Sequence, residues 1–262
     1  MEMREWAIRI LSADTLEDKL FNPIDLIDQN PGALLFWKEP TRGVGLHFHK
    51  HTRKSKLPKL WELHHPDKRA VCLHRFAGHE LLAVEIMAFA LLAFPDAPKH
   101  FRRGIANTLR EEQGHVKLYI QRMEDLGIKF GDLPLYRHFW SYTPYIRSPL
   151  NYISVMSLTF EMANLDFAPL YGSTFAEFGD DQSADLMKKI LEDEIDHVSF
   201  GMNWLRKLKE ASKSPWHTWL ESIPPKMDIH RACGAVLIEE HRKQAGIPQD
   251  WIDNLRKSRT PL

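Results

Sequence analysis

The sequence predicts an all-α protein whose centre is a four-helix bundle with one long crossover. Four long segments carry apolar residues at helical spacing, at about residues 67–94, 99–126, 149–178 and 180–209. Two tight turn signals, FPDAP and EFGDD, separate the first segment from the second and the third from the fourth. No segment shows the alternating pattern of a half-buried β-strand. These observations favour two helical hairpins joined by a long connection.

An N-terminal part, residues 1–66, precedes the bundle. Residues 1–21 are typical of one or two short amphipathic helices, with Ser12 or Asp14 as the expected caps. Residues 22–66 contain several prolines and glycines and show little periodicity. We therefore expect an irregular arm in front of the first long helix.

The bundle itself is expected to span residues 67–212. Its second and third helices are separated by GIKFGDLPLYRHFWSYTPYIRSP, which is too long for a hairpin turn and suits a crossover. Trp140 and Tyr142 in this stretch either cover a substrate entrance or simply pack the crossover. Residues 213–262 form a C-terminal extension. Shorter helices are expected there at 216–222, 228–245 and 249–259.

Composition and charge point to a soluble cytoplasmic protein. The chain has 262 residues, 35 basic and 35 acidic, so no net field favours nucleic acid or an anionic membrane. Cys72 and Cys233 cannot form a disulfide framework, which is typical of a reducing compartment. The N-terminus lacks the pattern of a signal peptide. The longest apolar run, LLAVEIMAFALLAF, has 14 residues and contains Glu85, too short and too polar to span a bilayer.

The second and fourth long segments share a Glu-x-x-His motif. Glu112 and His115 form the first copy, and Glu194 and His197 form the second, within DEIDHVSF. Residues three apart on a helix share a face, so each pair projects a carboxylate and an imidazole in one direction. Both pairs lie on apolar stripes that should face a core. One such motif is weak evidence, but two on successive hairpins are stronger.

The first helix of each hairpin adds a glutamate at the same level. Residues equidistant from the turn of an antiparallel hairpin lie side by side, and the midpoint of Glu80 and Glu112 is residue 96, inside FPDAP. The midpoint of Glu161 and Glu194 falls between residues 177 and 178, inside EFGDD. The separations, 32 and 33 residues, are nearly equal.

Four inward glutamates and two histidines at one level need a counter-charge, because burying an unpaired carboxylate costs several kcal/mol. Two divalent ions would supply four positive charges, and oxygen and imidazole ligands suit iron or manganese. This is the ligand set of ferritin-like dimetal carboxylate proteins. The alternative is carboxylates on solvated faces with two ordinary core histidines. The predicted ligands are Glu80, Glu112, His115, Glu161, Glu194 and His197.

The span from about residue 73 to 208 resembles the ferritin-like superfamily. HELLAVEIMAFALLAFPDAP, EEQGH and DEIDH in particular resemble an uncharacterised family of bacterial ferritin-like domain proteins. They are more distantly similar to the dimetal tRNA hydroxylases that act on isopentenyl-adenosine. The resemblance implies that Glu112 and Glu194 bridge two metals, either two iron ions or manganese in place of one or both. It assigns Glu80 and His115 to one metal, and Glu161 and His197 to the other.

Other acidic residues and one tyrosine lie near these ligands. Glu85 and Asp166 each follow a predicted ligand by five residues. Glu85 is a weaker ligand candidate than Glu80, because it is not as far from the turn as Glu112 is. Asp193 and Glu111 each precede the glutamate of a Glu-x-x-His pair. They either hold a ligand histidine from behind, as metal-bound imidazoles usually require, or are exposed helix-face charges. Tyr119, one turn beyond His115, is either a redox residue, by resemblance to ribonucleotide reductase small subunits, or an ordinary inward aromatic.

The arm contains a basic, histidine-rich stretch at residues 47–56. His47, His49 and His51 alternate there, with Lys50, Arg53, Lys54 and Lys56 among and after them. The cluster either meets phosphate or RNA or is solvated loop charge.

Three classes of function follow. The first is an oxygen-dependent hydroxylase or oxidase that acts on a small molecule or a modified tRNA base and takes electrons from an external donor. The second is a ferroxidase or peroxide-scavenging protein, and the third is a metal-free interaction module. The long flanking segments and the absence of a Cys-x-x-Cys pair favour the first class. The sequence leaves a homodimer open.

Overall fold

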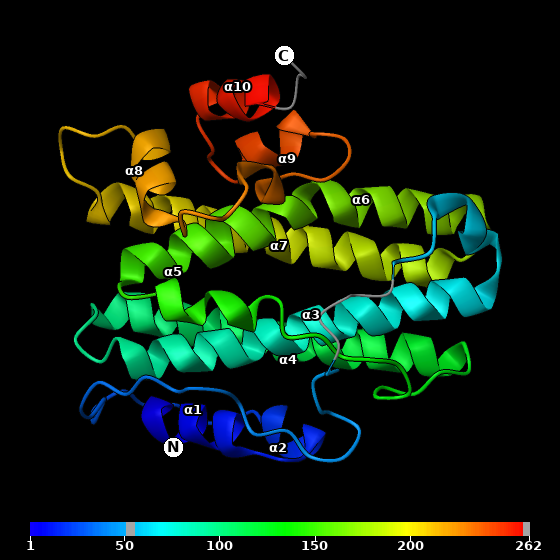
Figure 1. The fold of residues 1–262 in the computed structure, drawn as a ribbon, viewed down its shortest axis with the longest axis horizontal. Coiled ribbons are helices and arrows are strands. Elements are labelled where there is room, and N and C mark those ends of the chain that lie inside the picture. Colours follow the sequence, from blue (N-terminus) through cyan, green and yellow to red (C-terminus); the bar gives the residue numbers. More distant parts are fainter. Residues whose placement is uncertain (51–55, 259–262) are drawn as a thin grey trace. The chain divides into compact units, whose positions relative to one another are not determined.

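The computed structural model describes residues 1–50 and 56–258. Within these ranges the chain is helical, and its β-structure is confined to two isolated bridges. It divides into two compact units, Met1–Thr143 and Pro144–Leu262, and the boundary lies inside the predicted crossover (Figure 1). The prediction of an all-α fold is confirmed for the described residues. The ferritin-like bundle and the division into residues 1–66, 67–212 and 213–262 stay predictions.

The first unit is built on one long helical hairpin. Its two helices, α3 and α4, pack side by side and begin and end within a residue of the predicted 67–94 and 99–126 (Figure 1). Pro66 starts α3 at the position where a missing N–H does no harm. The helices of the unit are α1 (Met3–Ser12), α2 (Leu16–Lys19), the 3-10 helix η1 (Leu60–His64), α3 (Pro66–Ala93), α4 (Lys99–Asp125) and the 3-10 helix η2 (Trp140–Tyr145), which crosses the boundary.

The two N-terminal helices exist as predicted, but their caps are different residues. Ser12 is the last residue of α1, and its hydroxyl donates to the carbonyl of Ile8 at 2.8 Å. The cap of α2 is Thr15, whose hydroxyl accepts from the backbone N–H of Asp18 at 3.2 Å. The expectation of Ser12 or Asp14 is therefore wrong, because α1 runs further and α2 begins later than the sequence suggested.

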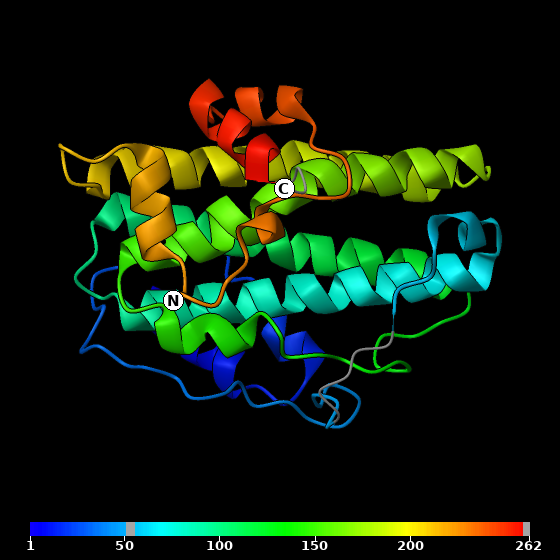
Figure 2. The same ribbon diagram turned by 45° about the horizontal axis from the view of Figure 1, so that its top comes forward.

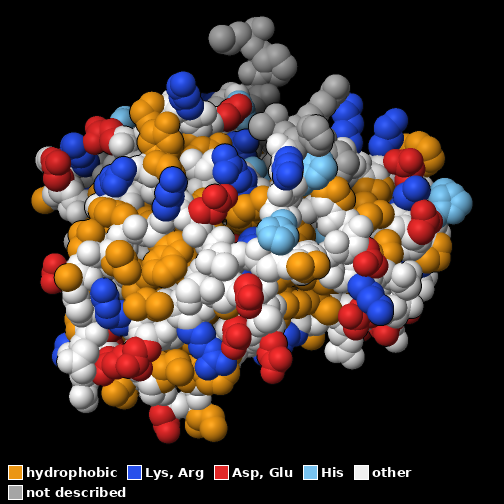
Figure 3. Space-filling view, turned by 60° about the horizontal axis from the view of Figure 1, so that its bottom comes forward, with side chains coloured by type: hydrophobic (Ala, Val, Ile, Leu, Met, Phe, Trp, Pro, Cys, Tyr) orange, Lys and Arg blue, Asp and Glu red, His pale blue; other side chains and the backbone are white. Residues whose placement is uncertain are grey.

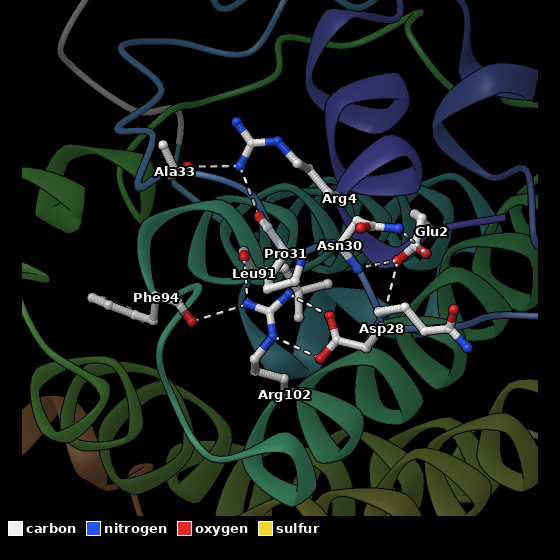
Figure 4. Close-up of polar contacts among 10 residues, drawn as sticks. Glu2, Arg4, Asp28, Asn30, Pro31, Ala33, Leu91, Phe94 and Arg102 are labelled. Carbon is white, nitrogen blue, oxygen red and sulfur yellow. Dashed lines mark hydrogen bonds and ion pairs between the residues drawn. The ribbon is translucent and has the colours of Figure 1, made fainter.

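A buried arginine ties the irregular arm to the turn of this hairpin. The Arg102 guanidinium donates twice to the Asp28 carboxylate, at 2.8 Å each, and also to the carbonyls of Leu91 and Phe94 at 2.7 and 2.9 Å (Figure 4). The two carbonyls belong to the last turn of α3, which has no following helical N–H to bind them. Arg102 thus caps α3 and fixes the arm at once.

A buried histidine holds the loop that follows α4. The His74 ring accepts from the backbone N–H of Gly131 at 3.1 Å. Gly131 has a φ of +97°, and a Cβ there would lie 2.5 Å from the carbonyl oxygen of Gly45. The loop therefore needs glycine at this position. Burial, helped by the neighbouring Arg75, lowers the pKa of His74 from 6.5 to about 4.

Acidification is expected to destabilise the protein through His74. Its pKa is 6.5 in an unfolded chain and about 4 when folded. Between these values the unfolded chain binds a proton that the folded chain does not, so stability falls as the pH drops through this window. The loss should reach about 3 kcal/mol at the lower end. Urea titrations at several pH values would measure it. The neutral variant His74→Gln should lose this part of the pH dependence, and an unchanged slope would contradict the assignment.

Helix α3 is longer than the apolar run that it contains. Among the described residues it is the one helix that could cross a membrane by length and composition alone, and 89% of its most apolar window is buried. Glu85, within the apolar run, is bound to two cations from the arm and the N-terminal helices. A buried ion pair of this kind is typical of a core helix.

The second unit contains the other long hairpin and the C-terminal segment. The predicted helix at 149–178 is continuous but contains one π-helical turn, and its partner α7 runs back beside it from the turn at Gly179 (Figures 1 and 2). The elements are α5 (Pro149–Val155), the π-helix η3 (Met156–Glu161), α6 (Met162–Glu177), α7 (Asp181–Leu208), α8 (Pro215–Ser222), the 3-10 helix η4 (Ile229–Ala232), α9 (Glu239–Gln244) and α10 (Gln249–Ser258).

The expected helix at 228–245 is wrong as a single element. The chain forms η4, leaves helical structure, and resumes as α9. The interruption folds around the Asp166 carboxylate, which accepts from the backbone N–H groups of Gly234 and Ile238. Gly234 packs so closely there that a Cβ would lie 2.6 Å from the Cβ of Asp166.

Candidate metal centre

Three predicted ligands meet in the first unit. Glu80 on α3 and Glu112 and His115 on α4 are all buried, and each offers a ligand atom within 4.8 Å of the other two. The His115 Nδ1 lies 3.1 Å from the Glu112 Oε2, as the spacing of three residues on a helix allows. We call these residues the first cluster.

The second unit carries an equivalent group, the second cluster. Glu161, at the end of η3, and His197, on α7, offer ligand atoms within 4.8 Å of each other. The His197 Nδ1 lies 3.4 Å from the Glu194 Oε2. All three side chains are buried. In each hairpin a glutamate from the first helix thus lies near the histidine of a Glu-x-x-His pair on the second.

The donor set of each cluster fits a divalent metal ion. Two carboxylates and one imidazole supply oxygen and nitrogen ligands of the kind that iron, manganese and zinc accept in proteins. When ionised, the two carboxylates carry two negative charges, which one divalent ion neutralises. Such an ion would offset the cost of burying ionised carboxylates. The buried clusters could therefore each hold a metal ion.

Glu161 is the last residue of a π-helical turn that no sequence pattern predicted. The carbonyl of Ser154, in α5 just before this turn, accepts from the Thr159 hydroxyl at 2.7 Å and from the Trp219 indole N–H at 3.2 Å. The indole N–H also lies 3.2 Å from the Thr159 hydroxyl. Single π-turns inside α-helices are frequent at functional sites. Trp219, on α8, thus braces the turn that ends at Glu161.

Asn164 is a further residue near the second cluster that the sequence did not single out. It lies on α6, one turn after Glu161, and its side-chain amide donates to the Glu194 Oε1 at 2.6 Å. The spacing of three residues from Glu161 could have suggested a shared face. Nothing in the sequence, however, distinguishes this asparagine from an ordinary polar residue.

The sequence suggested that Glu85 supports a metal ligand. In the structure it instead joins a buried ion triad. The Lys19 ammonium lies 2.9 Å from one of its oxygens, and the Arg42 guanidinium binds both at 2.6 and 3.1 Å. Burial lowers the pKa of Lys19, while the charge of Glu85 opposes that shift. The triad fastens α2 and the arm to α3.

Asp166 has the same kind of structural role in the second unit. Arg242 donates to its two oxygens at 2.6 and 2.9 Å, and both side chains are almost completely buried. The backbone N–H groups of Gly234 and Ile238 donate to it at 2.8 and 2.7 Å. The prediction that Asp166 assists a metal ligand is therefore corrected, because its carboxylate organises the C-terminal segment.

The remaining predicted neighbours lie on different sides of their helices. Glu111 is exposed, and Asp193 forms an ion pair with Lys189 at 2.5 Å. The exposure of Glu111 agrees with the helix-face alternative, whereas Asp193 is half-buried and its role behind a ligand histidine stays a prediction. Tyr119 is buried, and its ring meets that of Phe76 edge-on at 5.9 Å between centroids. This packing is typical of an inward aromatic side chain. A redox role of Tyr119 stays a prediction.

The crossover and the arm pack against each other in the first unit. The Trp140 indole donates to the Lys38 carbonyl at 3.0 Å, which favours the packing alternative for this residue. His47, His49 and Lys50 are exposed, whereas residues 51–55, with His51, Arg53 and Lys54, lie outside the described residues. Charged side chains of both signs are mixed with hydrophobic ones on the face drawn in Figure 3. The RNA contact stays a prediction.

Comparison with known proteins places the chain in a family. No curated protein and no solved structure matches it. The ferritin-like resemblance therefore stays a prediction. The family model described as "Protein of unknown function (DUF455)" matches residues 12–253. Since this match covers most of the chain, the protein belongs to the DUF455 family.

Proposed function

We propose that this protein is a dimetal-carboxylate oxidoreductase in which the first and second clusters each bind one metal ion. The observation that carries the proposal is that both hairpins place a buried glutamate of the first helix near the histidine of a buried Glu-x-x-His pair on the second. One such cluster could be a polar accident of a core. Two clusters with the same spacing, each about half-way along the helices of its hairpin, support a common function.

Glu80, Glu112 and His115 would hold one ion, and Glu161, Glu194 and His197 would hold the other. Iron in such a centre would supply reduction of dioxygen and oxidation of a bound substrate, with electrons from an external donor. The residues of the chain hold the ions and exclude water from them. The substrate class is a small molecule or a modified tRNA base.

Metal analysis tests the proposal. The protein reconstituted anaerobically with ferrous iron should hold close to two ions per chain, and the double variant Glu112→Ala/Glu194→Ala should hold almost none. The matched control is Glu124→Ala/Glu192→Ala, which removes two exposed glutamates from the same helices. It should keep both ions. Full binding by the first variant would refute the site, and a wild-type protein without metal would favour an interaction module.

Oxygen consumption then separates the hydroxylase from the ferroxidase. The iron-loaded protein should consume oxygen faster when supplied with an electron donor and either bulk tRNA or a small-molecule extract. Repeated turnover of free ferrous iron, unaffected by either addition, would identify a ferroxidase. In that case the metal clusters would stand while the substrate assignment failed.

A further inference from the structure

Glu194 differs from the buried carboxylates Glu85 and Asp166 in the kind of side chain that holds it. Glu85 and Asp166 are bound by Lys and Arg side chains, which neutralise them. The Glu194 Oε1 instead accepts from the neutral amide of Asn164 at 2.6 Å, and its Oε2 lies 3.4 Å from the His197 Nδ1. An amide fixes a carboxylate without cancelling its charge. The hydrogen bond from Asn164 therefore holds one oxygen of Glu194 in a defined direction.

The direction of the Asn164 hydrogen bond follows from chemistry. An ionised carboxylate has acceptors alone, so the side-chain NH₂ of Asn164 must face it. A donor–acceptor distance of 2.6 Å is short for a bond from nitrogen, as is typical when the acceptor is charged. With Oε1 engaged in this way, Oε2 is the oxygen that Glu194 turns toward His197.

The first cluster cannot use the same device. Asn164 follows Glu161 by three residues, and the residue three places after Glu80 is Ala83, whose methyl group has no donor. The first helices of the two hairpins therefore differ three residues after the cluster glutamate. An effect of Asn164 should be specific to the second cluster.

On the basis of the proposed function, we infer that Asn164 is a positioning residue for the metal ion of the second cluster. Its amide holds the Glu194 Oε1 and presents Oε2 beside His197, so that Glu194 binds through one oxygen. Partners of this kind typically change metal affinity about 10–100-fold when they are removed. The second ion thus depends on Asn164 and the first does not.

The test is a titration of the metal-free protein with Mn²⁺, followed by the electron paramagnetic resonance signal of the free ion. The wild-type protein should bind two ions. Asn164→Leu, similar in size but without a donor, should weaken one of them by about tenfold or more. The matched control is Asn151→Leu, since Asn151 is also half-buried in this unit and its amide donates to a backbone carbonyl, that of Ser222. It should leave both affinities within about twofold.

Two backgrounds assign the effect to a cluster. With His115→Ala, which removes a first-cluster ligand, Asn164→Leu should still weaken the remaining ion. With His197→Ala, it should change nothing. Asn164→Ala repeats the measurement in case Leu disturbs folding, which urea titration of the metal-free variants would reveal. Equal weakening of both ions, or of neither, would overturn the inference while leaving the two-metal proposal intact. A wild-type protein that binds no Mn²⁺ and no iron would overturn both.

Discussion

Replacing Glu85 with glutamine is expected to destabilise the protein by about 3–5 kcal/mol, the usual cost of removing one partner from a buried ion pair. The substitution leaves the Lys19 ammonium and the Arg42 guanidinium buried, without the carboxylate that they share. Lys19 keeps a hydrogen bond to the Ile10 carbonyl, but that bond does not cancel its charge. Urea titration followed by circular dichroism would measure the loss. Glu17→Gln, on the exposed side of α2, should leave the midpoint unchanged.

The pH dependence of the stability of Glu85→Gln shows which buried cation has lost its partner. Burial lowers the pKa of Lys19 from 10.5, and Glu85 opposes that shift, so Glu85→Gln lowers this pKa further. The folded variant then releases the lysine proton at a pH where the unfolded chain still binds it. Stability must rise with pH in that range, because the unfolded state binds more protons. The deficit should therefore shrink as the pH approaches 10.5. A deficit that stayed constant would show that Lys19 is not the stranded charge.

The long helices could be predicted closely because their signals are local. An apolar stripe that persists for more than 25 residues and ends at a proline or glycine turn leaves little choice of element. The bounds of α3, α4 and α7 accordingly lie within about one residue of expectation. The single helix expected at 228–245 failed for the opposite reason. Its break is imposed by Asp166, a residue more than 60 positions earlier in the chain.

The clusters could be predicted in part for the same physical reason. A Glu-x-x-His pair lies within one helical turn, and the level of Glu80 follows from the symmetry of the hairpin about its turn. The roles of Glu85 and Asp166 could not be predicted in this way. Their partners Arg42 and Arg242 come from irregular or short segments 43 and 76 residues away. The π-turn before Glu161 was also invisible, because its brace, Trp219, lies 65 residues from Ser154.

The two units solve one structural problem in parallel. In each, the first helix of the hairpin carries a cluster glutamate, and five residues later a second buried carboxylate binds an arginine from outside the hairpin. Neutralising the second carboxylate with an arginine and leaving the first to a metal keeps the two roles separate. The paired carboxylates are thus expected to affect stability, and the cluster carboxylates to affect metal binding.

Asp166→Asn gives the sharpest case of this separation. Asp166 accepts from two backbone N–H groups and twice from Arg242, and an asparagine can offer one oxygen and would turn an NH₂ group toward these donors. Leaving Arg242 buried without its carboxylate should lower the free energy of unfolding by about 3–5 kcal/mol. Urea titration would measure this, and proteolysis should begin between η4 and α9. Asp253→Asn, which removes a partly exposed ion pair with Arg256, should change neither.

A double variant distinguishes a stranded charge from lost packing. If the cost arises from the unpaired guanidinium, Asp166→Asn/Arg242→Met should recover part of the stability, because both charges are then gone. If Arg242→Met adds its own full loss to that of Asp166→Asn, the two side chains act independently and the ion pair is not what holds the C-terminal segment. Metal content is the second readout. Whatever fraction of the double variant is folded should still bind two ions, since neither residue belongs to a cluster.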